Sequence, residues 1–121
     1  MCLVRLASAA YWALLTVLLL APNPLALLGI HRPPGPSGGR GVHFVCFTLL
    51  AVLVHAGRWP VRRRLLVGLL LVYAVVIEGL QWFVPARSVE LLDVIENLLG
   101  LAVGTAIWWI AQRRTGEDRR S

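Results

Sequence analysis

The chain has 121 residues, a length that suits one compact unit, and 58% of them are hydrophobic while only 15% are charged. Soluble domains average about 45–50% and about 25%, and a soluble domain of this size could not bury so much apolar surface, so composition excludes an ordinary soluble protein. The formal net charge is +6 and every basic residue is an arginine; the arginines flank apolar runs, which argues against a nucleic-acid partner.

Four apolar stretches follow one another along the chain, and each predicts a helix embedded in the lipid bilayer, where about 20 residues span the hydrocarbon core. The expected helices cover residues 6–29, 42–59, 65–84 and 91–112. The first contains Pro22, so it either kinks or ends there; it would also fit a signal peptide, but no clean A-x-A site follows. The sequence therefore predicts an all-α, membrane-spanning bundle of about four helices over residues 1–112, with a charged cytoplasmic tail over 113–121.

The arginines also predict how the bundle is oriented, because cytoplasmic loops carry an excess of them. With the N-terminus inside, the inner segments hold Arg5, Arg58, Arg62, Arg63, Arg64, Arg113, Arg114, Arg119 and Arg120. The outer segments hold only Arg32, Arg40 and Arg87. We therefore expect both termini to be cytoplasmic.

Several polar side chains lie in the expected helices near their outer ends, where lipid should exclude them. They are His43 in the second helix, Glu78 and Gln81 in the third, and Asp93, Glu96 and Asn97 in the fourth. An ionisable side chain at the centre of a membrane helix costs about 2.5–3.5 kcal/mol on insertion scales, so each one needs a reason. Because all of them fall at one level, we expect a shared polar cluster facing outward. His55 lies near the inner end, away from this level, and we interpret it as structural.

One face of the fourth expected helix combines this polar character with small residues. At about 100° per residue, Asp93, Asn97, Gly100 and Gly104 lie close together around the helix. The spacing of the two glycines lets another helix pack closely on that face, which would direct the polar groups into the bundle. Arg87, in the preceding turn, could pair with Asp93 or Glu90 or hold an anionic ligand in a bidentate contact.

Two blocks of sequence resemble the VanZ-like family, small bacterial membrane proteins named after a teicoplanin-resistance factor. In that family a DKxxH block opens the second helix and an aromatic residue follows; here His43 and Phe47 match, Arg40 stands for the lysine, and Gly39 departs from the aspartate. The second block, E-x-x-Q-x-F-x-P-x-R-x-x-x-x-x-D-x-x-x-N-x-x-G-x-x-x-G, is filled by Glu78, Gln81, Phe83, Pro85, Arg87, Asp93, Asn97, Gly100 and Gly104. The resemblance covers residues 39–104.

The resemblance implies a four-helix protein of the bacterial cytoplasmic (inner) membrane, linked to the cell envelope or to glycopeptide antibiotics, and it implies no mechanism. We interpret the chain as a non-enzymatic envelope protein whose polar pocket binds a lipid-linked cell-wall precursor, a peptide-like ligand or a glycopeptide. No cofactor is expected, and no metal either, because a single histidine with carboxylates falls short of a three- or four-ligand site.

Three alternatives stay open. The first is an intramembrane enzyme acting on a lipid head group, with Glu78 or His43 as general base, Asp93 as orienting acid and Arg87 as anion clamp. The second is a small proton-coupled transporter or accessory subunit, which would need to form a homo-oligomer to enclose a path. In the third, the polar face only sets the register of the helices.

Overall fold

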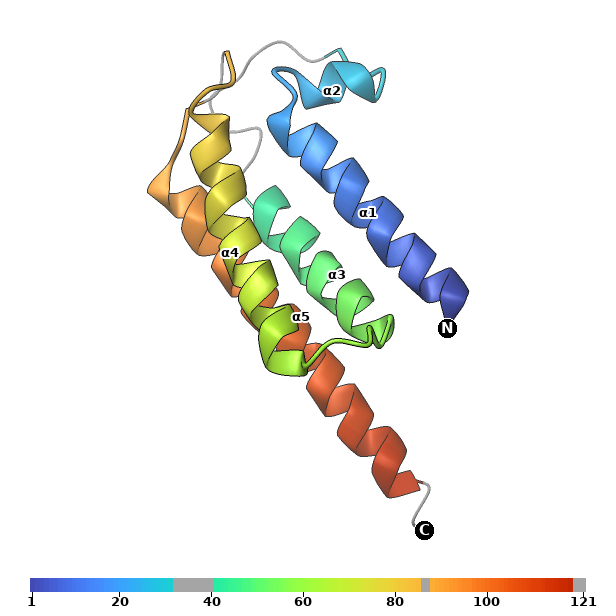
Figure 1. Cartoon of the computed structure of the whole chain (residues 1–121). Helices are drawn as coiled ribbons and strands as arrows, with labels where there is room; N and C mark the ends of the chain where they lie inside the picture. The colour runs from blue at the N-terminus through green and yellow to red at the C-terminus, as the bar shows by residue number, and fades with distance from the viewer. Residues whose placement is uncertain (32–40, 86–87, 119–121) are drawn as a thin grey trace.

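The computed structural model describes residues 1–31, 41–85 and 88–118, and every regular element in those ranges is a helix. In chain order (Figure 1) the helices are α1 (Cys2–Leu20), α2 (Pro24–Leu27), α3 (Val42–Ala56), α4 (Arg63–Gln81) and α5 (Leu91–Asp118). Three of them, α1, α4 and α5, are long and apolar enough to cross a membrane. The predicted all-α, membrane-spanning bundle is therefore confirmed.

The helix α3 is shorter than its neighbours and lies inside the bundle. It has 15 residues, whereas about 20 are needed to cross the hydrocarbon core. Phe47, Leu50, Ala51 and Val54 on this helix are completely buried. They are buried because α5 packs along α3 more extensively than any other helix does, and α1 covers another side. Figure 1 shows α3 between α1 on one side and α4 and α5 on the other, so α3 is the centre of the bundle.

The outer faces of the three long helices carry large exposed apolar side chains. Val17 on α1, Val72 on α4 and Val103 on α5 are examples, and each is exposed. In water, an apolar surface spread over three helices would be a liability for aggregation, whereas lipid tails contact it favourably. The exterior therefore belongs to a protein that is solvated by lipid.

The first helix ends earlier than the sequence prediction over residues 6–29. In the structure α1 ends at Leu20, and a separate turn of helix, α2, follows it. The first predicted helix is therefore interrupted and not kinked. Pro24 lacks an N–H and cannot continue a helix from the preceding turn, but it suits the first position of a new one. Asn23 caps that new helix, since its Oδ1 accepts a hydrogen bond from Ala26 N at 3.3 Å.

The last helix, by contrast, is longer than predicted. α5 continues to Asp118, so residues 113–118 of the expected tail extend the helix, while residues 119–121 lie outside the described part of the chain. Thr115 Oγ1 donates to the carbonyl of Ala111 at 3.2 Å, a local bond within this extension. The charged residues 113–118 predict a tail because they are too polar for a membrane span. Polar residues are nevertheless compatible with a helix that extends beyond the membrane.

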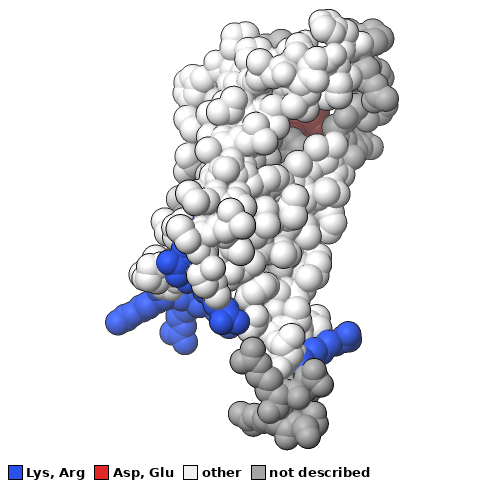
Figure 2. Space-filling view, turned by 90° about the vertical axis from the view of Figure 1, so that its right-hand side faces the viewer, with Lys and Arg blue, Asp and Glu red and all other residues white. Residues whose placement is uncertain are grey.

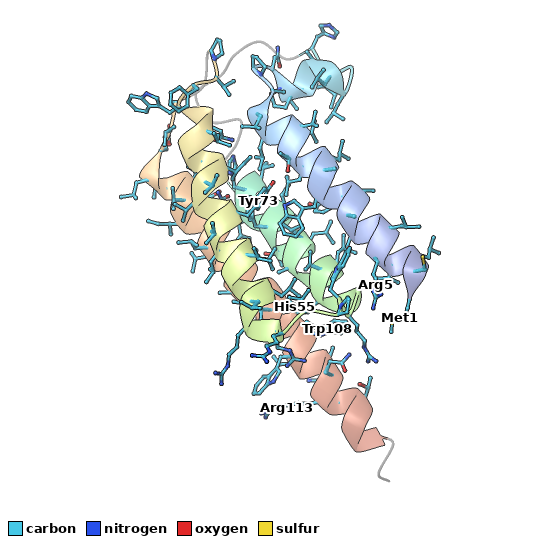
Figure 3. All side chains as sticks on the ribbon, in the orientation of Figure 1. Met1, Arg5, His55, Tyr73, Trp108 and Arg113 are labelled. Atoms are coloured by element: carbon cyan, nitrogen blue, oxygen red, sulfur yellow. The ribbon has the colours of Figure 1, made fainter. Side chains whose placement is uncertain are left out.

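Helix α1 is attached to α3 and α4 by polar and aromatic contacts. Thr16 Oγ1 on α1 and Tyr73 Oη on α4 are 2.8 Å apart, and the rings of Trp12 and Tyr73 meet edge to face at 5.2 Å between centroids. Tyr11 Oη donates to the carbonyl of Cys46 on α3 at 3.0 Å. Figure 3 shows Tyr73 in the middle of the bundle. These contacts fix the position of α1 against the other helices.

The described charged side chains separate to the two ends of the bundle. The arginines lie where α1 begins, α3 ends, α4 begins and α5 leaves the bundle; they are Arg5, Arg58, Arg62, Arg63, Arg64, Arg113 and Arg114. Figure 2 shows blue side chains gathered at this end, and one small recessed red patch towards the other. The acidic side chains whose placement is described are Glu78, Glu90, Asp93 and Glu96, near the end of α4 and the start of α5. The bundle therefore has a basic end and an acidic end.

Candidate functional site

The predicted polar residues lie on three helix ends that meet at the acidic end of the bundle. His43 is in the first turn of α3, Glu78 and Gln81 are in the last turn of α4, and Asn97 is in the second turn of α5. In Figure 1 the end of α4 and the starts of α3 and α5 all point away from the chain termini. Because α4 runs opposite to α3 and α5, residues far apart in sequence come to the same level.

Asn97 is the residue that joins the three helices. It is completely buried, and its Oδ1 lies 3.0 Å from Nδ1 of His43, which is 9% exposed. Its Nδ2 donates to the carbonyl of Ala74 on α4 at 3.5 Å. One amide on α5 therefore contacts a side chain of α3 and the backbone of α4.

These two contacts together favour one position of the proton on the His43 ring. The Ala74 carbonyl can only accept, so the Asn97 NH₂ group must face it. The Asn97 carbonyl oxygen then faces His43, and His43 Nδ1 must donate to it. In the neutral ring Nε2 consequently keeps its lone pair, and it can accept a proton or a hydrogen bond from a ligand.

Gln81 and Glu78 place two further polar groups in the interior, each only 1% exposed. Gln81 Nε2 donates to the carbonyl of Leu19 at 2.9 Å. That carbonyl lies in the last turn of α1, where a helix has no partners of its own for its C=O groups. The early end of α1 thus creates an acceptor that Gln81 satisfies, a link that the spacing of residues did not indicate. The carboxyl group of Glu78 lies one turn away on the same helix, and burying an ionisable group within a membrane helix is costly.

Glu96 binds the backbone at the start of α3. The sequence predicts it only as one member of the polar cluster. Gly41 N donates to both carboxylate oxygens of Glu96, at 3.2 and 3.1 Å. Gly41 precedes α3 with a φ of 84°, in the left-handed region that glycine adopts without strain. Asp93 is half-buried in the first turn of α5. Arg87, the predicted anion clamp, lies outside the described residues, so its role stays a prediction.

The two glycines of α5 lie against the backbone of α3. A Cβ atom at Gly100 would come within 2.5 Å of the Phe44 carbonyl oxygen, and one at Gly104 would overlap the Thr48 carbonyl and lie 2.7 Å from Ala51 Cβ. Only residues without a side chain allow this approach of two helices. The close packing brings the polar face of α5 against His43 on α3.

In chemical terms the cluster combines hydrogen-bond donors, acceptors and ionisable groups in a largely apolar setting. The amides of Gln81 and Asn97 are committed to protein partners, whereas Nε2 of His43 is able to act on a ligand. Within the part of the chain that the structure describes, no three His, Cys, Asp or Glu side chains are grouped so that they could hold a metal ion.

Fold and site together define a small helical membrane protein with a polar cluster buried among three helices at one end. A sequence model described as VanZ/LLP1 matches residues 6–112. The chain therefore belongs to the VanZ/LLP1 family, and the predicted family resemblance is confirmed. No curated protein and no solved structure matches the sequence.

Proposed function

We propose that this chain is a non-enzymatic envelope protein of the bacterial cytoplasmic membrane whose polar cluster binds a ligand near the outer leaflet. The orientation is supported by the gathering of the described arginines at the end where α1 begins and α5 leaves the bundle. Because arginine-rich ends of membrane proteins stay in the cytoplasm, both termini would be inside. The polar cluster would then lie on the outer side.

The burial of four polar side chains from three helices carries this proposal. Glu78, Gln81 and Asn97 are at most 1% exposed, and His43 is 9% exposed. Polar groups at membrane depth are expensive and are concentrated at sites that bind or move a ligand. A lipid-linked cell-wall precursor, a peptide-like ligand or a glycopeptide offers the amide and anionic groups that such side chains recognise. The family's link with teicoplanin resistance makes a glycopeptide-related role the first to test.

Removing the Glu78 carboxyl group should abolish this function. In a sensitive Gram-positive host, the wild-type protein is expected to raise the minimal inhibitory concentration of teicoplanin, and Glu78→Ala to return it to the level of the empty vector. Gly79→Ala is the matched control, because the space around a Cβ atom at that neighbouring position is open. All strains must contain equal amounts of protein in the membrane. Equal resistance in wild type and Glu78→Ala would contradict the proposal.

The orientation of His43 supports a second candidate, an intramembrane enzyme that acts on a lipid head group. Asn97 holds the protonated Nδ1 and leaves Nε2 able to take a proton from an attacking water or hydroxyl group. Loss of a general base costs about 10²–10⁴-fold in rate, so His43→Ala should lower turnover of a head-group-labelled cell-wall lipid by at least about 10²-fold while the lipid still binds. Absence of turnover by the wild-type protein would eliminate this candidate.

A further inference from the structure

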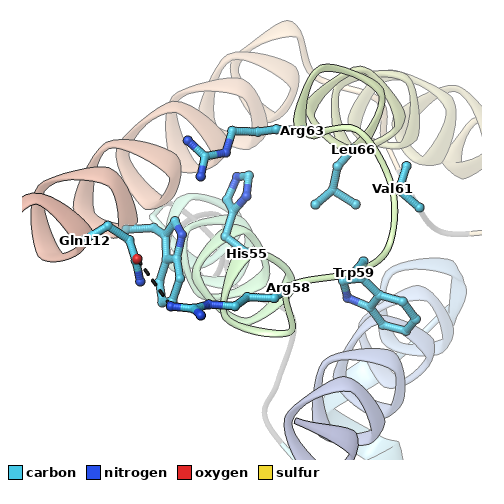
Figure 4. A pocket seen from close by; sticks show the side chains of 8 residues that line it. His55, Arg58, Trp59, Val61, Arg63, Leu66 and Gln112 are labelled. Atoms are coloured by element: carbon cyan, nitrogen blue, oxygen red, sulfur yellow. Dashed lines mark hydrogen bonds between the residues drawn. The ribbon is translucent and has the colours of Figure 1, made fainter. Parts of the chain in front are cut away.

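A polar cavity lies at the arginine-rich end of the bundle, opposite the cluster around Asn97. It has a volume of about 460 Å³ and opens between the end of α3, the loop to α4, the start of α4 and the C-terminal half of α5. Its polar and aromatic lining residues are His55, Arg58, Trp59, Arg63, Trp108 and Gln112. Figure 4 shows His55 between the side chains of Arg58 and Arg63. The cavity is separate from the cluster around Asn97.

The lining of this cavity is cationic. Arg58 and Arg63 both contribute guanidinium groups, and none of the residues that line it is acidic. Arg58 has a φ of 43°, a left-handed conformation that residues other than glycine rarely adopt without being held by their surroundings. Its Nη2 donates to Gln112 Oε1 on α5 at 3.4 Å, drawn as the dashed line in Figure 4. Arg58 therefore contributes one of the two positive charges of the cavity from an unfavourable backbone conformation.

The backbone at this end would otherwise repel an anion, because the last carbonyls of a helix carry partial negative charge. Arg5 counteracts that charge from α1. Its Nε donates to the carbonyl of Gly57 at 2.9 Å and its Nη2 to the carbonyl of Arg58 at 2.7 Å, directly after α3. A third arginine thus binds the two carbonyls that follow α3, and the cavity itself is lined by the guanidinium groups of Arg58 and Arg63.

An apolar hollow adjoins the cationic cavity and gives it a second, chemically different half. This hollow has a volume of about 440 Å³ and shares Trp59, Val61 and Leu66 with the cavity. It continues between α1 and α4 along Ala13 and Leu69. A free phosphate ion would occupy only the cationic half, whereas a phospholipid carries a phosphate and an acyl chain on one molecule.

We propose that the cationic cavity and the apolar hollow together bind one anionic phospholipid. Arg58 and Arg63 would hold the phosphate of the head group, and an acyl chain would lie along Ala13 and Leu69. Trp59 and Trp108 also line the cavity. Tryptophan is enriched at the membrane–water interface because its ring suits the head-group region, which supports a head group at this cavity. Basic pockets between membrane helices on the cytoplasmic side bind anionic head groups.

The test compares lipids in vesicles that contain the purified full-length protein. The vesicles are phosphatidylcholine with a fraction of brominated phosphatidylglycerol or of brominated phosphatidylcholine, and quenching of tryptophan fluorescence reports binding. The wild-type protein should prefer phosphatidylglycerol. The double variant Arg58→Gln with Arg63→Gln should lose most of this preference, about five-fold for each arginine removed near the phosphate. The single variant Arg63→Gln, which leaves the contact between Arg58 and Gln112 in place, should lose about five-fold and covers the case that the double variant does not fold.

The matched control is Arg62→Gln with Arg64→Gln, which removes the same charge from the same segment outside the cavity. This control should keep the preference; an equal loss in both double variants would mean diffuse attraction to an anionic surface and would overturn the proposal. Ala13→Phe, at an exposed position, should fill the apolar hollow and weaken binding of phosphatidylglycerol. Displacement of the lipid by excess inorganic phosphate would show a site for a free anion and would also overturn it.

Discussion

Replacing Gly104 with leucine is expected to separate α5 from α3 and to lower the free energy of unfolding by about 3 kcal/mol or more. A single Cβ atom at this position already overlaps the Thr48 carbonyl and lies 2.7 Å from Ala51 Cβ. The overlapping atom belongs to the backbone of α3, so no rotation of a side chain can relieve the contact. Because α3 is the centre of the bundle, the loss should spread to the whole fold. Titration with a denaturing detergent, followed by circular dichroism, measures the change.

The matched control for this prediction is Gly68→Leu on α4. A Cβ atom at Gly68 meets nothing within 4 Å, so leucine there should be tolerated and should raise stability by about 0.5–1 kcal/mol, the amount by which glycine weakens a helix. Gly100→Ala should behave like a milder form of Gly104→Leu, since its Cβ would approach the Phe44 carbonyl. Equal effects at Gly104 and Gly68 would show that the close packing of α3 on α5 is unimportant for stability.

The three long helices, α1, α4 and α5, could be predicted from the sequence because lipid imposes a simple rule of length and polarity on a helix that crosses it. The same rule could not decide whether the first helix kinks or ends at Pro22, because both outcomes satisfy it. The end at Leu20 depends on local partners, namely the Asn23 cap on α2 and the Gln81 side chain that satisfies the Leu19 carbonyl. The contact of Gln81 with Leu19 is set by tertiary structure and the Asn23 cap by local sequence, and the hydropathy pattern encodes neither.

The candidate site was predictable to the level of the helix turn but not to the level of the hydrogen bond. Counting along each helix predicts that His43, Glu78 and Asn97 lie towards one end of the bundle, and the helix ends that hold them, of α3, α4 and α5, lie at one end of the structure. The bond of Asn97 to the Ala74 carbonyl involves a backbone atom, for which the sequence gives no signal. The arginine-rich cavity was missed for a different reason. In the sequence, orientation accounts for its arginines and His55 has no sign of a role beyond structure, so only the fold reveals that they line one cavity.

We expect the hydrogen bond between His43 and Asn97 to be needed for function. Replacing both residues together should nevertheless lower the free energy of unfolding only slightly. His43→Leu or Asn97→Leu alone leaves a buried polar group without its partner, which should cost about 1–2 kcal/mol, in the range of hydrogen bonds between membrane helices. In the double variant no polar group of the pair remains, and leucine has a similar size to both residues, so stability should return to that of the wild type except for the lost contact of Asn97 with the Ala74 carbonyl, about 1 kcal/mol or less. Detergent unfolding of the four proteins gives the coupling energy.

Resistance to teicoplanin should follow a different pattern, lost in both single variants and also in the stable double variant. A double variant that is stable but not resistant indicates a ligand site. If the polar face only set the register of the helices, resistance would recover together with stability. Tyr11→Phe is the control: it removes one hydrogen bond between α1 and α3, at 3.0 Å, away from the cluster, and should cost about 1 kcal/mol without loss of resistance. A double variant that is both stable and fully resistant would assign the pair a structural role. The ligand would then have to contact Glu78 and its surroundings without His43.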